Sequence, residues 1–379
     1  MFVRPSLTSI IRNTTQPIRA MSTIKAHSIV YNNYGEPLEQ LKAHSYDINL
    51  DSLKPDDILV QTVACPINPS DINQIQGVYP SRPEISIDAL PNLESPAAPT
   101  GNEGLFKVVA TGSNVTGFEK GDWCIPAGVN FGTWTTHKVT KDKNLLKMPK
   151  TISKTQAATI AVNPSSAYQM LTQFVKLQPG DWFIQNGANS QVGRAAIQIG
   201  KKLGFKSLNI VRNRDNLDEL VKELESLGAT KVITEDDNES KDYGKVIKQL
   251  LNGQEIKLGL NCVGGPSATG LARKLGNDAT MLTYGAMSMK PVSLPTGLFI
   301  FKNLTAKGFW ITGNIKRHPE TRLETINAVI KLMEDGDLVD AKYNETQINP
   351  NEVSNEEFLQ SFLNAIQNSK KGKQLVVFE

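Results

Sequence analysis

The chain has 379 residues, which is long for a single hydrophobic core, so we expect two domains. Its 39% hydrophobic and 21% charged residues are typical of a globular protein, and no apolar run is long enough to predict a membrane-spanning helix. The formal net charge is only +3, which leaves no general basic surface and argues against a nucleic-acid-binding role.

Residues 1–22 differ in composition from the rest of the chain. They contain Arg4, Arg12 and Arg19, several serines and threonines, and no acidic residue, so these arginines equal the whole net charge of +3. Their apolar residues could share one face of a helix, with the arginines on another. This pattern is typical of a mitochondrial presequence and predicts import into the mitochondrial matrix. The alternative is a disordered basic tail.

The three cysteines, Cys65, Cys124 and Cys262, are scattered along the chain. Their spacing matches neither a zinc cage nor the disulfide framework of a secreted protein. We therefore expect three small side chains that are buried or half-buried and hold no metal.

From about residue 24 to residue 150, the sequence is rich in short β-type runs separated by Gly, Pro and Asn. We expect strands at residues 24–30, 58–67, 105–115 and 134–140. Helical periodicity is weak there, and the proline-rich stretch Ser81–Thr100 predicts a long loop. The pattern indicates an irregular β-barrel-like unit.

From about residue 153 the pattern changes to alternating helices and strands. We expect helices at residues 155–175, 191–204, 215–228, 321–336 and 356–369. The expected strands are residues 181–187, 207–213, 231–234, 257–265, 279–285 and 304–312. Such alternation predicts an α/β fold with a parallel, doubly wound sheet. The last strand, residues 373–379, is expected to return to the first unit, because the second sheet is complete without it.

A glycine-rich turn, Gly187–Gly193, separates the strand at residues 181–187 from the helix that follows. Such a turn lets the backbone approach a pyrophosphate, and the helix N-terminus offers free N–H groups to it. The turn departs from the G-x-G-x-x-G pattern, because Asn189 replaces the middle glycine and Gly193 comes one residue late. An ordinary tight turn is therefore the alternative.

The next strand ends at Arg212, Asn213 and Arg214, where an NAD-binding fold would place an acidic residue for the ribose. A guanidinium favours the 2′-phosphate of NADPH, whereas a carboxylate repels it. This predicts NADPH rather than NADH, with two solvated arginines as the alternative. Two further strand ends, Val263–Gly265 and Tyr284–Met287, fall where ligands bind in such sheets.

Together these segments resemble the medium-chain dehydrogenase/reductase superfamily. The resemblance implies a GroES-like catalytic domain at residues 23–160, completed by residues 340–379, and a Rossmann-type NADPH-binding domain at residues 161–339. Zinc-dependent members carry a histidine in a G-H-E segment, but this chain has Asn102 at that position. It also lacks the cysteine cluster of the structural zinc, so the resemblance implies a metal-free reductase.

Within that superfamily, residues 64–80, 101–112 and 302–310 resemble mitochondrial trans-2-enoyl-thioester reductases. This implies NADPH-dependent reduction of enoyl thioesters carried on acyl carrier protein or coenzyme A, by a homodimer. In that family the residue matching Tyr79 is the proposed catalytic acid or substrate-orienting donor. The residue pattern alone also allows an aromatic side chain that packs beside Pro80 in a turn.

Carried over residue by residue, the cofactor contacts of the family fall on Asn163, Ser190, Gln191, Val192, Gly193, Arg194, Arg212, Asn213, Arg214, Tyr284, Gly285, Ala286, Met287, Phe309, Trp310, Ile311, Thr312 and Lys373. Trp310 could instead be a core residue or line the acyl site.

The basic run Lys316–His318 with Arg322 is either a solvated face or a contact for coenzyme A phosphates or an acidic carrier protein. Two other functions stay open: a quinone or enone reductase on the same fold, and an NADPH-bound protein that binds nucleic acid.

Overall fold

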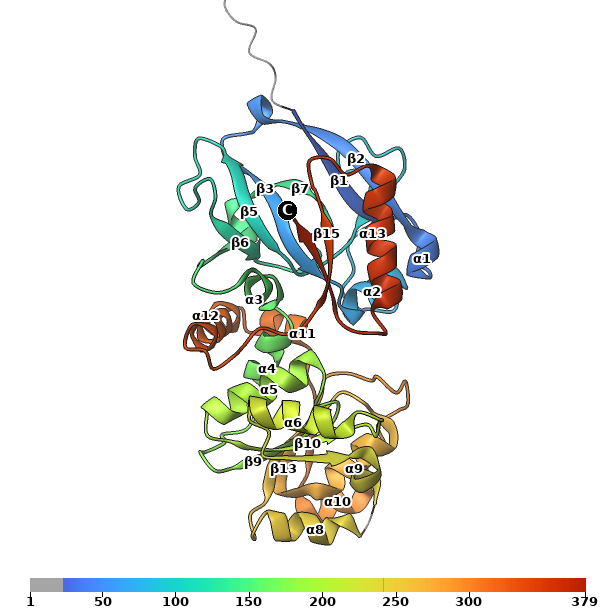
Figure 1. The fold of residues 1–379 in the computed structure, drawn as a ribbon, viewed down its shortest axis with the longest axis vertical. Coiled ribbons are helices and arrows are strands. Elements are labelled where there is room, and N and C mark those ends of the chain that lie inside the picture. Colours follow the sequence, from blue (N-terminus) through green and yellow to red (C-terminus); the bar gives the residue numbers. More distant parts are fainter. Residues whose placement is uncertain (1–22, 241) are drawn as a thin grey trace, which may run out of the picture.

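The computed structural model describes residues 23–240 and 242–379, and the expected presequence lies outside the described residues. Two lobes are stacked along the long axis of the molecule (Figure 1). Both ends of the described chain belong to the upper lobe, while the lower lobe is built from the middle of the sequence. Among the described residues, no helix is long and apolar enough to cross a membrane.

The upper lobe contains two β-sheets, as the β-rich first part of the sequence predicts. The smaller sheet has the order β2-β1-β4, and the larger has the order β15-β16-β3-β5-β6-β8, with β7 also on β3. Their bounds are β1 Thr23–Tyr31, β2 Leu41–Asn49, β3 Asp57–Pro66, β4 Ala98–Pro99, β5 Leu105–Thr111, β6 Trp123–Pro126, β7 His137–Lys141, β8 Leu145–Met148, β15 Asn344–Ile348 and β16 Gln374–Phe378.

The end of the chain returns to this lobe, as expected. Strand β16 pairs antiparallel with β3 and parallel with β15. Strand β15 was not predicted from the sequence. Helix α13, Asn355–Asn368, packs beside these strands (Figure 1). Its Phe362 is fully buried and stacks on Trp134 at a centroid distance of 5.1 Å. Residues 344–378 are therefore part of the upper lobe.

The lower lobe contains a six-stranded parallel sheet with the order β11-β10-β9-β12-β13-β14, which confirms the predicted doubly wound fold. The strands are β9 Trp182–Gln185, β10 Lys206–Val211, β11 Lys231–Thr234, β12 Ile256–Asn261, β13 Leu275–Thr283 and β14 Thr305–Gly308. The strand order reverses between β9 and β12, and ligands bind at such a switch point in α/β sheets.

Helices cover both faces of this sheet. Hydrophobic clusters on one face include residues of α4 Asn163–Thr172, α5 Gln191–Lys202, α6 Leu217–Leu227 and α12 Glu320–Glu334. The cluster on the other face includes residues of α8 Tyr243–Leu250, α9 Gly265–Lys274 and α10 Thr296–Lys302. The first face continues into the upper lobe, because one cluster contains both Leu105 of β5 and Phe183 of β9. The two lobes therefore share a core.

The remaining helices are short: α1 Pro37–Gln40, α2 Pro69–Ile75, α3 Lys154–Thr159, α7 Glu235–Glu239 and α11 Ile311–Arg317, with 3₁₀ turns at Leu50–Ser52 and Asp142–Asn144.

Three of the secondary-structure predictions need correction. The helix expected at residues 155–175 is split into α3 and α4, because Pro164 has no N–H to donate to the carbonyl of Ile160 and its ring would clash with that carbonyl in a continuous helix. The strand expected at residues 304–312 ends at Gly308, and α11 begins at Ile311. Helix α2 lies in the region expected to hold only strands and loops.

Candidate active site

The glycine-rich turn lies at the carboxyl end of β9, and two of its glycines are sterically required. Gly187 has a φ of +59°, and a Cβ there would come 2.6 Å from the sulfur of Cys262. A Cβ on Gly193 would lie 2.5 Å from the carbonyl oxygen of Ala188. Helix α5 begins directly after Ser190, whose hydroxyl accepts a hydrogen bond from the N–H of Gly193 at 3.1 Å. This close approach of helix and strand is the geometry of a pyrophosphate-binding turn.

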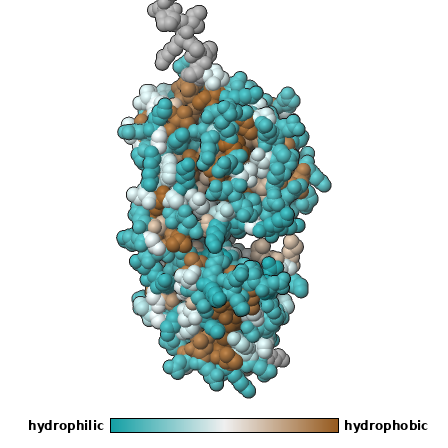
Figure 2. All heavy atoms as spheres, viewed as in Figure 1, coloured by the Kyte–Doolittle hydropathy of each residue, from teal (hydrophilic) through white to brown (hydrophobic). Residues whose placement is uncertain are grey.

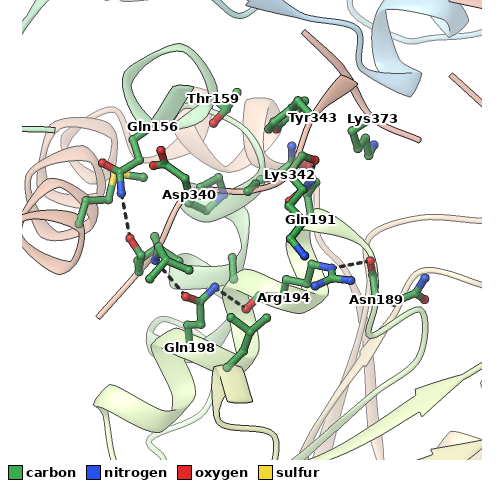
Figure 3. Close-up of a pocket in the computed structure, with 18 of the residues that line it drawn as sticks. Gln156, Thr159, Asn189, Gln191, Arg194, Gln198, Asp340, Lys342, Tyr343 and Lys373 are labelled. Carbon is green, nitrogen blue, oxygen red and sulfur yellow. Dashed lines mark hydrogen bonds between the residues drawn. The ribbon is translucent and has the colours of Figure 1, made fainter. Parts of the chain in front are cut away.

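A cavity of about 410 Å³ lies beside this turn, between the two lobes (Figure 3). Four of the predicted cofactor contacts line it: Asn163, Gln191, Arg194 and Lys373. They come from both lobes, because Lys373 immediately precedes β16 whereas the other three belong to α4 and α5. The surface is hydrophilic over most of the face seen in Figure 2, and it is hollowed where the lobes meet.

Two buried polar atoms at this site lack a hydrogen-bond partner within the described chain. One is the side-chain nitrogen of Asn163. The other is the hydroxyl of Tyr284, which lies beside Ser190 and Cys262 without a hydrogen bond of normal geometry. Buried polar groups are nearly always partnered, so these two atoms fit a ligand that would supply the missing partners. A bound dinucleotide is such a ligand.

Arg194 is less free to bind a cofactor than the sequence suggests. Its guanidinium forms an ion pair with Glu223 of α6 at 2.9 Å. It also donates to the carbonyl of Asn189 at 3.1 Å, as Figure 3 shows. Lys342 approaches the same carboxylate at 3.1 Å. Hydrogen bonds from Arg194 and Lys342 hold the pKa of Glu223 below its usual value. Arg194 therefore joins α5 to α6.

The arginines in the three residues after β10 differ from Arg194, because they have no ion-pair partner among the described residues. Arg212 and Asn213 are exposed and Arg214 is half-buried, at the carboxyl edge of the sheet. Neither arginine forms an ion pair with any residue in the described ranges. They do not line the cavity itself. Two guanidinium groups without carboxylate partners at this edge could hold a phosphate.

The predicted contacts between residues 309 and 312 have different surroundings. Phe309 is buried in the hydrophobic core, edge-on to Phe174 at a centroid distance of 5.6 Å. Ile311 packs against the same core, and Thr312 is buried in the first turn of α11. Trp310 alone reaches toward the upper lobe.

Tyr79 meets Trp310 where the lobes face each other. The indole N–H of Trp310 donates to the Tyr79 hydroxyl oxygen at 2.8 Å, and the two rings lie edge to face. Tyr79 is placed by the turn after α2, where its backbone N–H donates to the carbonyl of Asn73 at 3.1 Å. An indole is only a donor, so the phenolic proton of Tyr79 remains free for another acceptor. Burial raises the Tyr79 pKa, which keeps that proton in place.

A buried polar network lies behind Tyr79. Asn102 donates to Asp71 at 2.7 Å and to Gln74 at 2.6 Å, and its oxygen accepts from the N–H of Asn130 at 2.8 Å. The whole amide is thus used by protein groups, and these residues do not fit a zinc ion. Within residues 23–240 and 242–379, no group of three His, Cys, Asp or Glu side chains could hold a metal. The three cysteines are buried and free, as expected.

Sequence reasoning missed most of this network. Asp71 and Glu103 are fully buried carboxyl groups, and burial raises their pKa values to about 6 and about 7. One signal was available: Asn68 and Asp71 form a capping box at the start of α2, with Pro69 at the first helical position.

The basic run at residues 316–318 is exposed at the end of α11. Arg322 is not part of the same surface, because it is half-buried and donates to the carbonyl of Pro126 at 2.7 Å. The exposed basic surface therefore consists of Lys316, Arg317 and His318, without the expected Arg322.

Family models match two parts of the chain: the alcohol dehydrogenase GroES-like domain at residues 54–150, and the zinc-binding dehydrogenase at residues 192–333. The mitochondrial enoyl-[acyl-carrier-protein] reductase 2 of Candida tropicalis is 48% identical, over 99% of this chain and 98% of its own length. An NADPH quinone oxidoreductase of Kluyveromyces marxianus is 45% identical, over 87% of each chain.

Solved structures are similar over nearly the whole fold. A complex of Etr1p with NADP and crotonyl-CoA is 48% identical, with a TM-score of 0.90 over 93% of this chain and 100% of that one. The heterodimer of the mitochondrial 2-enoyl thioester reductases Etr1p and Etr2p from Candida tropicalis has the same identity, TM-score and coverage.

The hydrogen bond between Trp310 and Tyr79 can be tested through ionisation. Burial raises the Tyr79 pKa, and the donor from Trp310 opposes that by stabilising the phenolate. The Trp310→Phe variant should therefore have a higher Tyr79 pKa than the wild-type protein. Ultraviolet difference absorbance would measure tyrosine ionisation, with Tyr79→Phe identifying the contribution of this residue among the eight tyrosines.

The control for this experiment is Trp182→Phe. Trp182 is a buried tryptophan whose indole N–H donates to Gln254 in the lower lobe. That change should leave the Tyr79 pKa as it is. An unchanged or lower Tyr79 pKa in Trp310→Phe would contradict the hydrogen bond.

Proposed function

The chain belongs to the mitochondrial enoyl-[acyl-carrier-protein] reductases of the medium-chain dehydrogenase/reductase superfamily, and from that premise we propose that it reduces trans-2-enoyl thioesters with NADPH. The observation that carries this proposal is the Tyr79 hydroxyl, held by Trp310 at the junction of the lobes with its proton free. The similar Etr1p complex with NADP and crotonyl-CoA supports the cofactor and the substrate class.

NADPH, when bound, supplies the hydride that is added to the β-carbon of the enoyl group. Negative charge then develops on the thioester carbonyl oxygen, and a donor aimed at that oxygen lowers the barrier. Tyr79 supplies this donor, because its raised pKa keeps the phenol protonated at neutral pH. The α-carbon must gain a proton to complete the reduction. Tyr79 is the acid that supplies it or the group that orients the carbonyl while it arrives.

The residues around the cleft divide the work of holding the cofactor. The turn residues Ser190–Arg194 offer the N-terminus of α5 to the pyrophosphate, and Arg212–Arg214 face the 2′-phosphate. Asn163 and Lys373, which line the cavity, would serve the nicotinamide end. Tyr284–Met287 and Phe309–Thr312 are proposed to complete that end from outside the cavity lining, with Phe309 and Thr312 themselves buried. Residues 23–160 and 340–379 would form the catalytic domain, and residues 161–339 the NADPH-binding domain.

Quinone reduction is the second candidate. It is favoured by one relative, the NADPH quinone oxidoreductase of Kluyveromyces marxianus, at 45% identity. A nucleic-acid-binding role has no comparable support. The relatives named enoyl reductases are mitochondrial, which supports a place for this chain in the mitochondrial matrix.

A second copy of the chain is the proposed partner at one edge of the lower lobe. Strand β14 is the last strand of its sheet, and all four of its residues are exposed. Helix α10, which leads into β14, exposes Ile300 and Phe301 at 66% and 81% of their surface. An open strand edge next to exposed apolar side chains invites pairing with another strand. The similar Etr1p/Etr2p heterodimer supports assembly into a dimer.

The first prediction concerns Tyr79. Replacing it with Phe removes the donor aimed at the carbonyl oxygen, so kcat with NADPH and crotonyl-CoA should fall roughly 10²–10³-fold. The loss of NADPH absorbance measures the rate, and a quinone tested in parallel separates the two candidate functions. NADPH binding should be unchanged in this variant. A folded wild-type protein that binds NADPH and fails to oxidise it with crotonyl-CoA would rule out the enoyl-thioester function.

The second prediction concerns cofactor choice. Arg212→Ala and Arg214→Ala each remove a charged contact to the 2′-phosphate, so KM for NADPH should rise roughly ten- to a hundredfold. KM for NADH should hardly change, because NADH has no such phosphate. The matched control is Arg273→Ala, an exposed arginine at the end of α9, near the opposite edge of the sheet. Equal losses for the two cofactors would show that these arginines do not read the phosphate.

The third prediction concerns assembly. Phe301→Asp places a charge in the proposed interface and should convert the dimer to a monomer, as measured by light scattering after size-exclusion chromatography. Leu323→Asp, an equally drastic change at an exposed leucine of α12, should leave the mass unchanged. A dimer that survives Phe301→Asp would place the interface elsewhere.

A further inference from the structure

The carboxylate of Glu103 is buried where the lobes meet, with 2% of the residue exposed. One oxygen accepts a hydrogen bond from the side-chain nitrogen of Asn68 at 2.8 Å, and the other accepts from the backbone N–H of Val162 at 2.8 Å. Asn68 is the N-cap residue of α2, and Val162 is the N-cap residue of α4. A single side chain therefore joins the first turns of two helices.

Both helices lead to residues of the proposed site. Helix α2 ends just before the turn that presents Tyr79, and that turn is anchored by the carbonyl of Asn73 within α2. Helix α4 begins with Asn163, whose side-chain nitrogen is buried without a partner beside the cavity. Glu103 is thus connected through Val162 to the neighbouring Asn163, and through Asn68 and helix α2 to the turn that carries Tyr79.

The surroundings make this a costly place for a carboxylate. Among the described residues Glu103 forms no ion pair, although Asp71, Arg322, Tyr343 and Lys373 are close enough to influence its charge or to be influenced by it. Burial without an ion pair disfavours the charged form, so the two N–H donors are its main compensation. A carboxylate suits this position because both of its oxygens accept.

A glutamine would not serve the same purpose. It has the same shape, but its NH₂ group would face either the side-chain nitrogen of Asn68 or the N–H of Val162. One of the two connections would then be donor against donor. The difference between Glu and Gln therefore isolates the link between α2 and α4 from the volume of the side chain.

We propose that Glu103 is a positioning residue that fixes the start of α4, and with it the Asn163 amide, relative to the segment that carries Tyr79. This rests on the proposed function, because it assigns Asn163 to the cofactor. Glu103 itself touches neither cofactor nor substrate and acts through the backbone of Val162.

A double-mutant cycle on NADPH affinity tests this directly. Glu103→Gln should raise Kd for NADPH about tenfold, the usual size of one lost buried hydrogen bond. Asn163→Ala should raise it by a similar factor. The double variant should be little worse than either single variant, because both changes remove the same contact. With crotonyl-CoA, kcat of Glu103→Gln should fall while KM for crotonyl-CoA stays close to that of the wild type.

Two further variants guard against a merely structural effect. Asp57→Asn removes another buried carboxyl of the upper lobe, one that is held by Lys141 at 2.6 Å, and it should cost stability without changing Kd for NADPH. Asn68→Ser keeps a side chain that can cap α2 but cannot reach Glu103. It should raise Kd for NADPH in the same direction as Glu103→Gln, and it replaces that variant if Glu103→Gln does not fold.

The outcomes separate cleanly. Additive effects of Glu103→Gln and Asn163→Ala, or a normal Kd in both Glu103→Gln and Asn68→Ser, would overturn the proposed link. A wild-type protein that binds NADPH but leaves crotonyl-CoA unreduced would overturn the proposed function instead, while the affinity cycle would still report on Glu103.

Discussion

Tyr79 and Trp310 are 231 positions apart in the chain, and their polar atoms are 2.8 Å apart in the structure. This contact fixes where a proton donor can stand relative to the dinucleotide turn, because Tyr79 belongs to the upper lobe and Trp310 follows the last strand of the lower one. Its direction matters as much as its length. An indole can only donate, so it holds the phenol oxygen and leaves the phenol proton free for another acceptor.

The contact works only if the two lobes keep their relation to each other. The shared hydrophobic cluster that contains Leu105 and Phe183 provides a nonpolar part of that constraint. The buried hydrogen bonds of Glu103 provide a polar part, since they tie the first turns of α2 and α4. Hydrophobic burial is non-directional, whereas hydrogen bonds to the Asn68 side chain and the Val162 backbone require a defined distance and angle. The polar contacts therefore set the register in which the packed lobes meet.

The sequence predicts what depends on local sterics and pattern. We could predict the glycine-rich turn, the parallel sheet and the return of β16 to the upper lobe from the sequence. Each of these features follows from neighbouring residues or from the number of strands that the second sheet needs. The burial of Phe309 in the core and the burial of Glu103 between the lobes cannot be predicted in this way. Glu103 contacts residues 35 and 59 positions away, and no periodicity encodes such a meeting. The split between α3 and α4 was signalled by Pro164, but the apolar pattern across it outweighed that signal.

Asn102 shows how the same position can serve a different purpose. Where zinc-dependent relatives would place a metal ligand, this chain has an amide whose donors and acceptor are taken by Asp71, Gln74 and Asn130. These bonds attach the start of β5 to α2, the helix that leads to Tyr79. In the proposed mechanism the donor to the thioester carbonyl is the Tyr79 hydroxyl, and the hydrogen bonds of Asn102 stabilise the helix that leads to it.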